Sequence, residues 1–262
     1  MTAWEGIVLG LVQGLTEFLP VSSSGHLAMT RALYGLAGDL PFEILIHGAT
    51  LLAILLYFRR RIAGLLAGRS PSYVGKLALS VVPAVIAALA FRRWIDLAFV
   101  SPEFVPPTLA FTGAALLSLY FVPQGRWHGE GPDAGSVEPT WGAAWWIGCA
   151  QAIAILPGVS RSGSTIVAGV WLGLAPAAAA EFSFLMGIPA ITGALVLEAP
   201  HMGGAGGSAD LGTLALGFVA AFLSGLAAIH LVFRLLARRG FRKFGFYCWA
   251  MALAFGAFLW LR

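Results

Sequence analysis

The stretch "QGLTEFLPVSSSGHL" (residues 13–27) places a carboxylate, an amide, three consecutive serines and a histidine between apolar segments, "GIVLGLV" before it and "FEILIHGATLLAILLYF" after it. A second stretch, "ILPGVSRSGSTIVAG" (155–169), repeats the arrangement with an arginine. Polar, non-helical backbone at membrane depth survives only where protein or a wet cavity satisfies it. Both stretches therefore predict broken helices that line a site inside a membrane protein.

The composition supports that class. The chain has 262 residues, of which 59% are hydrophobic and 11% are charged, whereas soluble domains are about a quarter charged. Several apolar runs approach the roughly 20 residues that cross a bilayer as a helix. The net charge of +4 comes from basic residues in short loops, which is typical of membrane topology signals and excludes nucleic acid as a partner. We predict an all-α polytopic membrane protein.

The order of the segments repeats, and "GLVQGLTEFLPVSSSG" resembles "GCAQAIAI-LPGVSRSG". Paired interrupted segments of this kind are typical of inverted-topology repeats with a site at the midplane. We predict one integral membrane domain with two such repeats, each a re-entrant helix pair plus three transmembrane helices. The first repeat (1–122) contains the pair 3–36 and helices at 42–58, 74–91 and 104–122. A linker follows at 123–140. The second repeat (141–262) contains the pair 142–174 and helices at 177–198, 211–233 and 244–261.

The basic loops predict the orientation. "RRRIAGLLAGRS" (59–70) and "RLLARRGFRK" (234–243) should be cytoplasmic, which places both termini on the outer side. Arg92 and Arg93, predicted on the outer side, count against this layout. Charge does not distinguish re-entrant pairs from spanning pairs, but the shortness of the segments favours re-entrant ones.

The two breaks predict an anion site. Pro20 and Pro157 each interrupt a helix before a Ser/Gly run, and serine is a good N-cap for a restarting helix. Helix N-termini bind phosphate readily, and Arg161 adds a planar fork that matches phosphate oxygens. An intramembrane arginine is functional by default; its alternative roles are a structural ion pair or contact with a lipid headgroup. The predicted substrate-binding residues are Gln13, Ser22, Ser24, Gly158, Ser160, Ser162 and Thr165.

Glu17 lies four residues after Gln13, so both share one helical face. The Glu17 carboxylate could orient a nucleophile, accept a proton or, with Gln13, help to hold a divalent cation. It could also pair with Arg161, and these roles are compatible. His26 follows Ser23 by three positions and could act as its base or protonate a leaving oxygen; the alternative is a polar core histidine.

Other polar residues allow several interpretations. Thr165 could donate to a phosphate or bond its own backbone, and His47 could face the site. Glu43 and Glu181 occupy similar places in the two halves and are expected to tie helices together.

These residues resemble the undecaprenyl-diphosphate phosphatase family, the bacitracin-resistance integral membrane phosphatases. The resemblance covers essentially the whole chain, through "QGLTEFLPVSSSGH", "PGVSRSGST", "AAEFSFLMGIP" and "FRKFGFYCWA". One departure is Gln13, where some members of that family have a second carboxylate. With one carboxylate fewer, protein ligands alone should hold Mg²⁺ or Ca²⁺ less tightly.

The resemblance implies hydrolysis of undecaprenyl diphosphate to undecaprenyl phosphate and inorganic phosphate, which recycles the lipid carrier of peptidoglycan synthesis. It implies a bacterial inner-membrane enzyme with interlocked repeats, a periplasmic active site, a divalent cation (Mg²⁺ or Ca²⁺) and a homodimer. The catalytic residues would be Glu17, Ser23, His26 and Arg161. The rival interpretation is a flippase of polyprenyl phosphate, alone or combined with hydrolysis, because broken inverted repeats are also transporter architecture.

Overall fold

A computed structural model describes residues 1–123, 125, 127, 135–198, 200 and 209–261. Within these residues the structure is helical apart from turns and one isolated bridge between Ser136 and Leu174. The all-α class is therefore confirmed. Part of the predicted linker 123–140 lies outside the described residues. The helices are α1 (Ala3–Phe18), α2 (Ser23–Tyr34), α3 (Leu40–Tyr57), α4 (Arg59–Leu66), α5 (Pro71–Ala90), α6 (Arg92–Val100), η1 (Pro102–Phe104), α7 (Val105–Ser118), η2 (Leu119–Phe121), α9 (Trp141–Ile153), α10 (Arg161–Trp171), α11 (Pro176–Glu198), α12 (Leu211–Ala237), η4 (Phe241–Lys243) and α13 (Phe244–Trp260).

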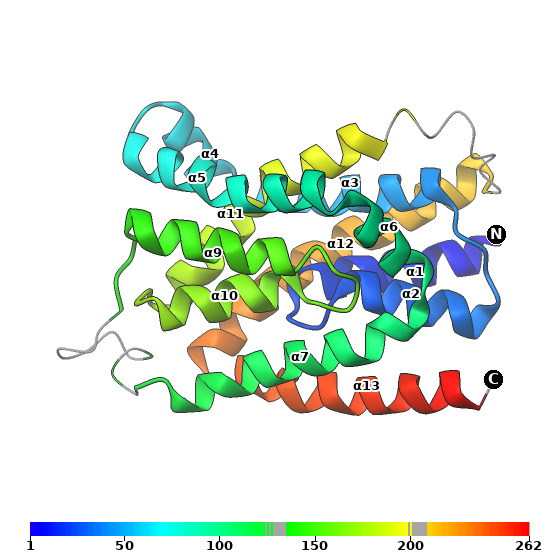
Figure 1. Cartoon of the computed structure of the whole chain (residues 1–262). Helices are drawn as coiled ribbons and strands as arrows, with labels where there is room; N and C mark the ends of the chain where they lie inside the picture. Colours follow the sequence, from blue (N-terminus) through cyan, green and yellow to red (C-terminus); the bar gives the residue numbers. More distant parts are fainter. Residues whose placement is uncertain (124, 126, 128–134, 199, 201–208, 262) are drawn as a thin grey trace.

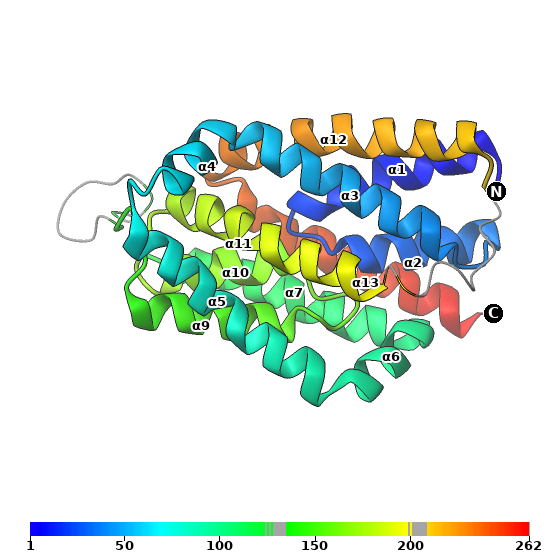
Figure 2. The ribbon, with the colours of Figure 1, turned by 90° about the horizontal axis from the view of Figure 1, so that it is seen from above.

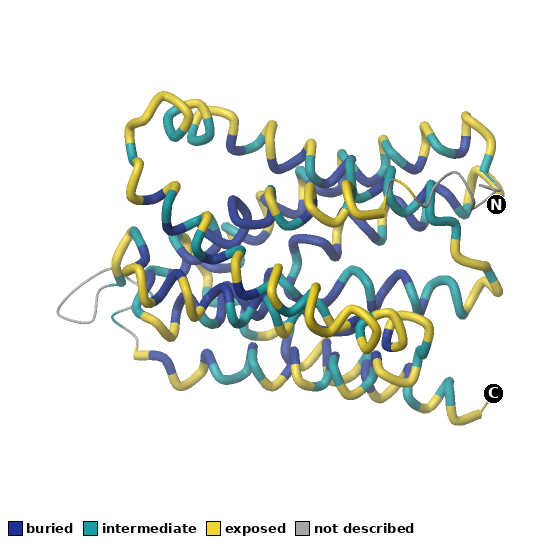
Figure 3. The backbone as a smooth tube through the Cα atoms, turned by 45° about the horizontal axis from the view of Figure 1, so that its top comes forward, coloured by how far each residue is buried: buried dark blue, intermediate teal, exposed yellow. Residues whose placement is uncertain are grey.

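Six stretches of the described chain are long and apolar enough to cross a membrane, judged by length and composition. They are Leu40–Tyr57, Pro71–Ala90, Pro102–Phe121, Pro176–Glu198, Leu211–Ala237 and Phe241–Trp260. This confirms a multi-pass membrane protein. Many large apolar side chains are exposed, among them Leu223, Leu253 and Trp260. Exposed residues recur along the outer helices of the bundle (Figure 3). Such exposure suits a surface that faces lipid tails rather than water.

The helices on either side of the two breaks are shorter than a bilayer requires: α1 and α2 have 16 and 12 residues, and α9 and α10 have 13 and 11. The pair α1–α2 extends inward from the end of the molecule where both chain termini lie, and α9–α10 extends inward from the opposite end (Figure 1). Their two breaks, residues 19–22 and 154–160, meet in the middle. Local sequence explains the restarts, because Ser22 and Ser160 cap α2 and α10 by accepting backbone N–H groups.

A short helix from each half of the chain packs against a long helix from the other half. Helix α1 packs against α12, and α9 packs against α5. Figure 2 shows α12 and α3 running alongside α1. Pro102–Phe121 and Phe241–Trp260 lie against each other through α7 and α13. This exchange is the pairing that two interlocked repeats would produce; the division into repeats at 1–122 and 141–262 stays a prediction.

Glycines allow the short helices to approach their partners closely. A Cβ atom at Gly10 of α1 would collide with backbone of Gly217 in α12, and one at Gly14 would collide with Ser224 and Ala221. A Cβ atom at Gly148 of α9 would likewise collide with backbone of Ser80 in α5. Small residues at such contacts are the usual means of helix packing in membranes, where burying apolar surface provides little driving force.

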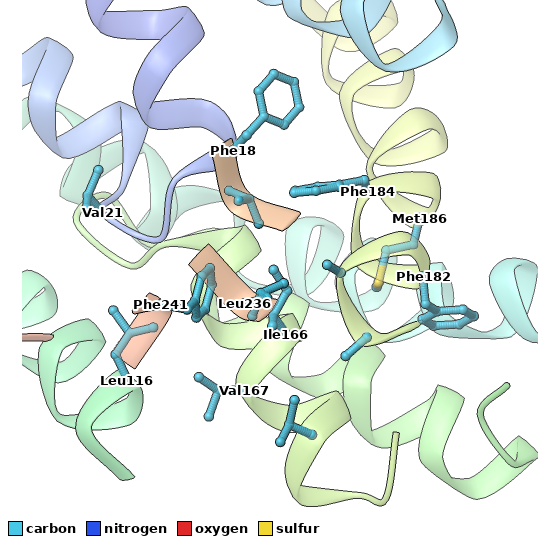
Figure 4. Packing of buried hydrophobic residues seen from close by; sticks show 14 of the residues in the cluster. Phe18, Val21, Leu116, Ile166, Val167, Phe182, Phe184, Met186, Leu236 and Phe241 are labelled. Carbon is cyan, nitrogen blue, oxygen red and sulfur yellow. The ribbon is translucent and has the colours of Figure 1, made fainter. Parts of the chain in front are cut away.

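The largest apolar cluster lies next to the breaks. Figure 4 shows Phe18, Phe184, Ile166, Leu236 and Phe241 converging from α1, α11, α10, α12 and η4. The rings of Phe18 and Phe184 meet edge to face, with centroids 5.5 Å apart. Because Phe18 directly follows Glu17 in the chain, this packing fixes the C-terminal turn of α1 and the carboxylate that it carries.

Candidate active site

The two breaks are joined by hydrogen bonds across the middle of the molecule. The hydroxyl of Ser162 donates to the carbonyl of Leu19 at 3.2 Å, and the backbone N–H of Gly158 donates to the hydroxyl of Ser24 at 3.4 Å. Residues more than 130 positions apart in the chain are thus in contact, and we call this region, where the two breaks and the helix ends beside them meet, the junction. Helices α2 and α10 both begin there. Such N-termini carry partial positive charge, which favours an anion.

Glu17 is the centre of this junction. Its Oε1 accepts a hydrogen bond from Arg161 Nη2 at 2.6 Å. Its Oε2 accepts from Ser23 Oγ at 2.7 Å and from Gln13 Nε2 at 3.2 Å. The residue is only 9% exposed, so these donors replace the water that the carboxylate would otherwise need. Glu17 therefore pairs with Arg161 and orients Ser23 at the same time.

Arg161 is the first residue of α10, directly after the cap Ser160. Its second terminal nitrogen, Nη1, donates to the carbonyl of Ser183 in α11 at 3.3 Å. The guanidinium lies against Gly187, where any Cβ would collide with it. The fork is therefore held on two sides, by a carboxylate and by a carbonyl. Ser183 was not among the predicted site residues, although it lies in the stretch "AAEFSFLMGIP", which carries part of the resemblance.

The first break contains a strained residue. Ser22 has φ 69° and ψ 104°, a backbone conformation that side-chain-bearing residues rarely adopt. Its hydroxyl accepts the N–H of Gly25 at 3.2 Å and lies 3.2 Å from the hydroxyl of Ser24. Strain of this kind costs about 1–3 kcal/mol and clusters at functional sites. It allows α2 to begin at Ser23, so that the Ser23 hydroxyl reaches Glu17.

His26 is held away from the carboxylate. Its Nδ1 lies 2.9 Å from the carbonyl oxygen of Ser22, and its Nε2 lies 2.8 Å from the hydroxyl of Tyr247 in α13. Ser23 donates to Glu17 instead, so Glu17 rather than His26 is placed to act as the base of Ser23. Sequence spacing alone had left that role open. Tyr247 was missed because it lies 221 positions from His26.

Helix α7 supports the second break. The Thr108 hydroxyl lies 2.6 Å from the carbonyl oxygen of Pro157. The Thr112 hydroxyl lies 3.1 Å from the carbonyl oxygen of Gly158 and accepts the N–H of Ser160 at 3.1 Å. Gly158 has φ 90°, and a Cβ there would also collide with Thr108. Glycine is therefore required at this position for two reasons.

Three hydroxyls that we expected to face a diphosphate are fully buried in the junction. Ser160 accepts the N–H of Gly163 at 3.1 Å, and Ser162 is bonded across the breaks as described above. Thr165 takes the second of its two alternatives: its hydroxyl donates to the carbonyl of Arg161 at 2.7 Å, and it lies 2.6 Å from the Ser183 hydroxyl. These hydroxyls hold the site together, and their contact with substrate stays a prediction.

The ion pairs outside the junction tie helices together, as predicted. Glu43 of α3 pairs with Arg31 of α2, and Glu181 of α11 pairs with Arg61 of α4 at 2.8 Å. His47 lies one turn after Glu43 in α3, near the Glu17 carboxylate. His47 is thus a further polar residue of the first half near the junction.

The oxygen atoms around Glu17 fit a divalent cation only in part. The part of the chain that the structure describes holds no group of three or more His, Cys, Asp or Glu residues that could bind a metal. However, Gln13 Oε1 is buried and makes no hydrogen bond within the described residues. One carboxylate and one free amide oxygen suit Mg²⁺, which often binds through one or two carboxylates, water and substrate phosphates. These two oxygen donors would fit a divalent cation only together with further oxygen ligands from water or phosphate.

Comparison with known proteins gives a consistent result. Residues 6–254 match the family model described as "Bacitracin resistance protein BacA". The chain is 40% identical over 274 residues to an undecaprenyl-diphosphatase of Syntrophotalea carbinolica, with 98% of this chain and 99% of that protein covered. It is 38% identical over 283 residues to an undecaprenyl-diphosphatase of Salinibacter ruber, with both chains fully covered. An undecaprenyl-diphosphatase of Desulfosudis oleivorans is 38% identical over 281 residues, with 98% and 97% covered. The family resemblance expected from the motifs is thereby confirmed, and the chain belongs to the BacA family of bacitracin resistance proteins.

Proposed function

We propose that this membrane protein hydrolyses undecaprenyl diphosphate to undecaprenyl phosphate and inorganic phosphate. The observation that carries the proposal is the junction itself, where one buried carboxylate, Glu17, binds both the Ser23 hydroxyl and the Arg161 guanidinium. The names of the relatives, undecaprenyl-diphosphatases that align along the whole chain, supply the substrate. The reaction recycles the lipid carrier of cell-wall synthesis.

The residues divide the work as phosphoryl transfer requires, mainly by positioning and charge stabilisation. The Arg161 fork and the N-termini of α2 and α10 bind the terminal phosphate and stabilise the negative charge that develops on it. Glu17 accepts the proton of the Ser23 hydroxyl, or of a water that this hydroxyl positions. The oxygen that loses its proton attacks the terminal phosphorus, and undecaprenyl phosphate departs as the anhydride bond breaks. If Ser23 itself attacks, water then hydrolyses the seryl phosphate.

A divalent cation would be held by Glu17 and Gln13 Oε1 together with the diphosphate. It would neutralise charge on the phosphate oxygens. Because the protein offers few oxygen ligands of its own, activity should depend on added Mg²⁺ or Ca²⁺ and should be lost in a chelator.

Phosphate release from farnesyl diphosphate, a soluble short-chain substrate, tests the proposal. Purified protein in detergent should release inorganic phosphate with Mg²⁺ or Ca²⁺ present. The Glu17→Gln variant should release almost none. A flippase without hydrolase activity releases no phosphate, so an inactive parent protein that is folded and monodisperse would contradict the proposal.

We propose that the protein lies in the bacterial inner membrane, with its active site open to the periplasm. The support is topological. Both chain termini lie at one end of the molecule (Figure 1), whereas the basic residues of α4 and of the turn after α12 lie at the other, and basic loops favour the cytoplasm. In a background without Cys149 and Cys248, single cysteines at Ala67 and Arg239 should resist membrane-impermeant thiol reagents in intact cells. Rapid labelling of both would invert the orientation.

The family resemblance also leads us to propose a homodimer. Native mass spectrometry of the protein released from detergent micelles should show twice the mass of the chain. A single-chain mass at all protein concentrations would contradict this.

A further inference from the structure

Tyr247 contacts the junction from the last helix of the chain. Its hydroxyl lies 2.8 Å from His26 Nε2. The two rings are nearly parallel, with an interplanar angle of 10° and centroids 5.7 Å apart. The phenol therefore contacts His26 through both its face and its hydroxyl, although the two residues come from opposite halves of the chain.

The partners of the imidazole determine where its protons lie. The Ser22 carbonyl, 2.9 Å from Nδ1, can only accept a hydrogen bond, so Nδ1 carries a proton. In the neutral ring Nε2 is then the acceptor, and the Tyr247 hydroxyl donates to it. Both ring nitrogens are thus engaged, and Tyr247 is the partner of the nitrogen whose proton can change.

We propose that Tyr247 is a catalytic residue for the reaction: it fixes the tautomer of His26 and passes the proton of His26 on to the departing phosphate. This rests on the proposed function. When His26 is protonated, Nε2–H donates to the phenol oxygen. As that proton moves to the oxygen, the phenol releases its own proton to the leaving phosphate. Tyr247 ends the step unchanged and His26 ends it neutral.

The hydroxyl is not needed for packing. The neighbouring residue, Cys248, is fully buried and lies 3.5 Å from the Pro20 carbonyl, so it already supports the first break. Tyr247 is 42% exposed, and its ring also contacts Phe244 edge to face. Phenylalanine would preserve both ring contacts and remove only the hydrogen bond to His26. The substitution therefore separates the chemical role of Tyr247 from its structural one.

Tyr120 provides a matched control. It is 43% exposed, it too contacts aromatic and cationic neighbours, and Arg242 lies 4.0 Å above its ring. Unlike Tyr247, it has no hydrogen bond to His26. Loss of its hydroxyl should leave activity unchanged.

The experiment measures kcat and KM for phosphate release from farnesyl diphosphate across pH. It compares the parent, Tyr247→Phe, His26→Ala, the double variant and Tyr120→Phe. We expect Tyr247→Phe to lower kcat about ten-fold, a fraction of what general acid–base catalysis contributes, with little change in KM. In the plot of kcat against pH, the limb that is lost in His26→Ala should still be present in Tyr247→Phe but should lie at a different pH. The double variant should match His26→Ala, because one proton passes through both groups and either substitution interrupts its path.

Three outcomes would overturn the inference while leaving the proposed function intact: parent-like kcat in Tyr247→Phe, an unmoved pH limb, or additive losses in the double variant. A well-folded parent that releases no phosphate would instead overturn the proposed function and this inference with it. Unchanged melting temperature and elution volume of Tyr247→Phe would establish that any loss of activity is not a loss of fold.

Discussion

The two breaks are built from similar sequence but carry different chemistry. The first is short, residues 19–22, and it depends on a strained serine, Ser22. The second is longer, residues 154–160, and it depends on a glycine, Gly158, at φ 90°. Helix α13 contacts the first break through Cys248 and the adjoining helix α2 through Tyr247, whereas α7 contacts the second break through two threonines.

The polar residues of the two breaks show what this difference means. The echoing stretches align Gln13 with Gln151 and His26 with Ser164. Gln13 donates to Glu17 and His26 is bonded at both nitrogens. By contrast, the side chains of Gln151 and Ser164 are buried and make no hydrogen bond within the described residues. The helices that flank the first break therefore hold the reactive groups, and those that flank the second contribute mainly the charge of Arg161.

Glu17→Gln should have the largest effect, because it removes the acceptor of the Ser23 proton and the counter-charge of Arg161. We expect kcat for phosphate release to fall about 1,000-fold, within the range for loss of a general base. The control is Glu181→Gln, which breaks the ion pair with Arg61 away from the junction. Equal losses in both variants would show that the effect comes from stability rather than chemistry.

Ser23→Ala should follow, with kcat about 100-fold lower and substrate binding retained, since groups that act as one unit each cost most of the rate when removed. Ser24→Ala is the comparison, because Ser24 bonds the backbone of Gly158 instead of Glu17, and its kcat should fall no more than a few-fold. Near-normal turnover by Ser23→Ala, or acid-labile phosphohistidine trapped at His26, would transfer the role of nucleophile to another group.

Arg161→Lys should lower activity about thirty-fold and raise KM, because lysine keeps the charge but loses the planar fork. The fork reaches Glu17 and Ser183 at once, which a single ammonium group cannot reproduce. Arg61→Lys is the control, because it makes the same exchange in the ion pair with Glu181, outside the site. Activity of Arg161→Lys within a few-fold of the parent would mean that charge alone suffices.

Substitution of the two aligned glutamines should have the smallest effects. One substitution should increase stability, whereas the other should decrease activity. Gln151→Leu removes a buried amide that makes no hydrogen bond within the described residues. This should raise the free energy of unfolding by about 1–2 kcal/mol and leave kcat unchanged. Gln13→Leu removes a donor to Glu17 and the free oxygen available to a cation, so it should lower kcat and weaken activation by Mg²⁺. Thermal melts in detergent and metal titrations measure both. Loss of activity in Gln151→Leu would show that the second break also holds reactive groups.

The sequence by itself determined the class of the protein, its six long helices and the two broken ones. It also identified Glu17, Ser23 and Arg161, which meet at the junction, but neither Ser183 nor Tyr247. These features depend on local causes: the lengths of apolar runs, prolines that interrupt helices, and serines that cap the next one. Glu17, Ser23 and Arg161 could be selected because charged and reactive side chains are costly between apolar segments.

Only the tertiary structure decided which of these residues bind one another. Glu17 and Arg161 lie 144 positions apart, and His26 and Tyr247 lie 221 apart. Nothing in local periodicity specifies such pairs, because they depend on how α10 and α13 pack against the first break. The same packing buried the hydroxyls of Ser160, Ser162 and Thr165, which the sequence had assigned to substrate. A serine at a helix start has the same local pattern whether it faces a ligand or a neighbouring backbone carbonyl, and the surrounding helices decide between them.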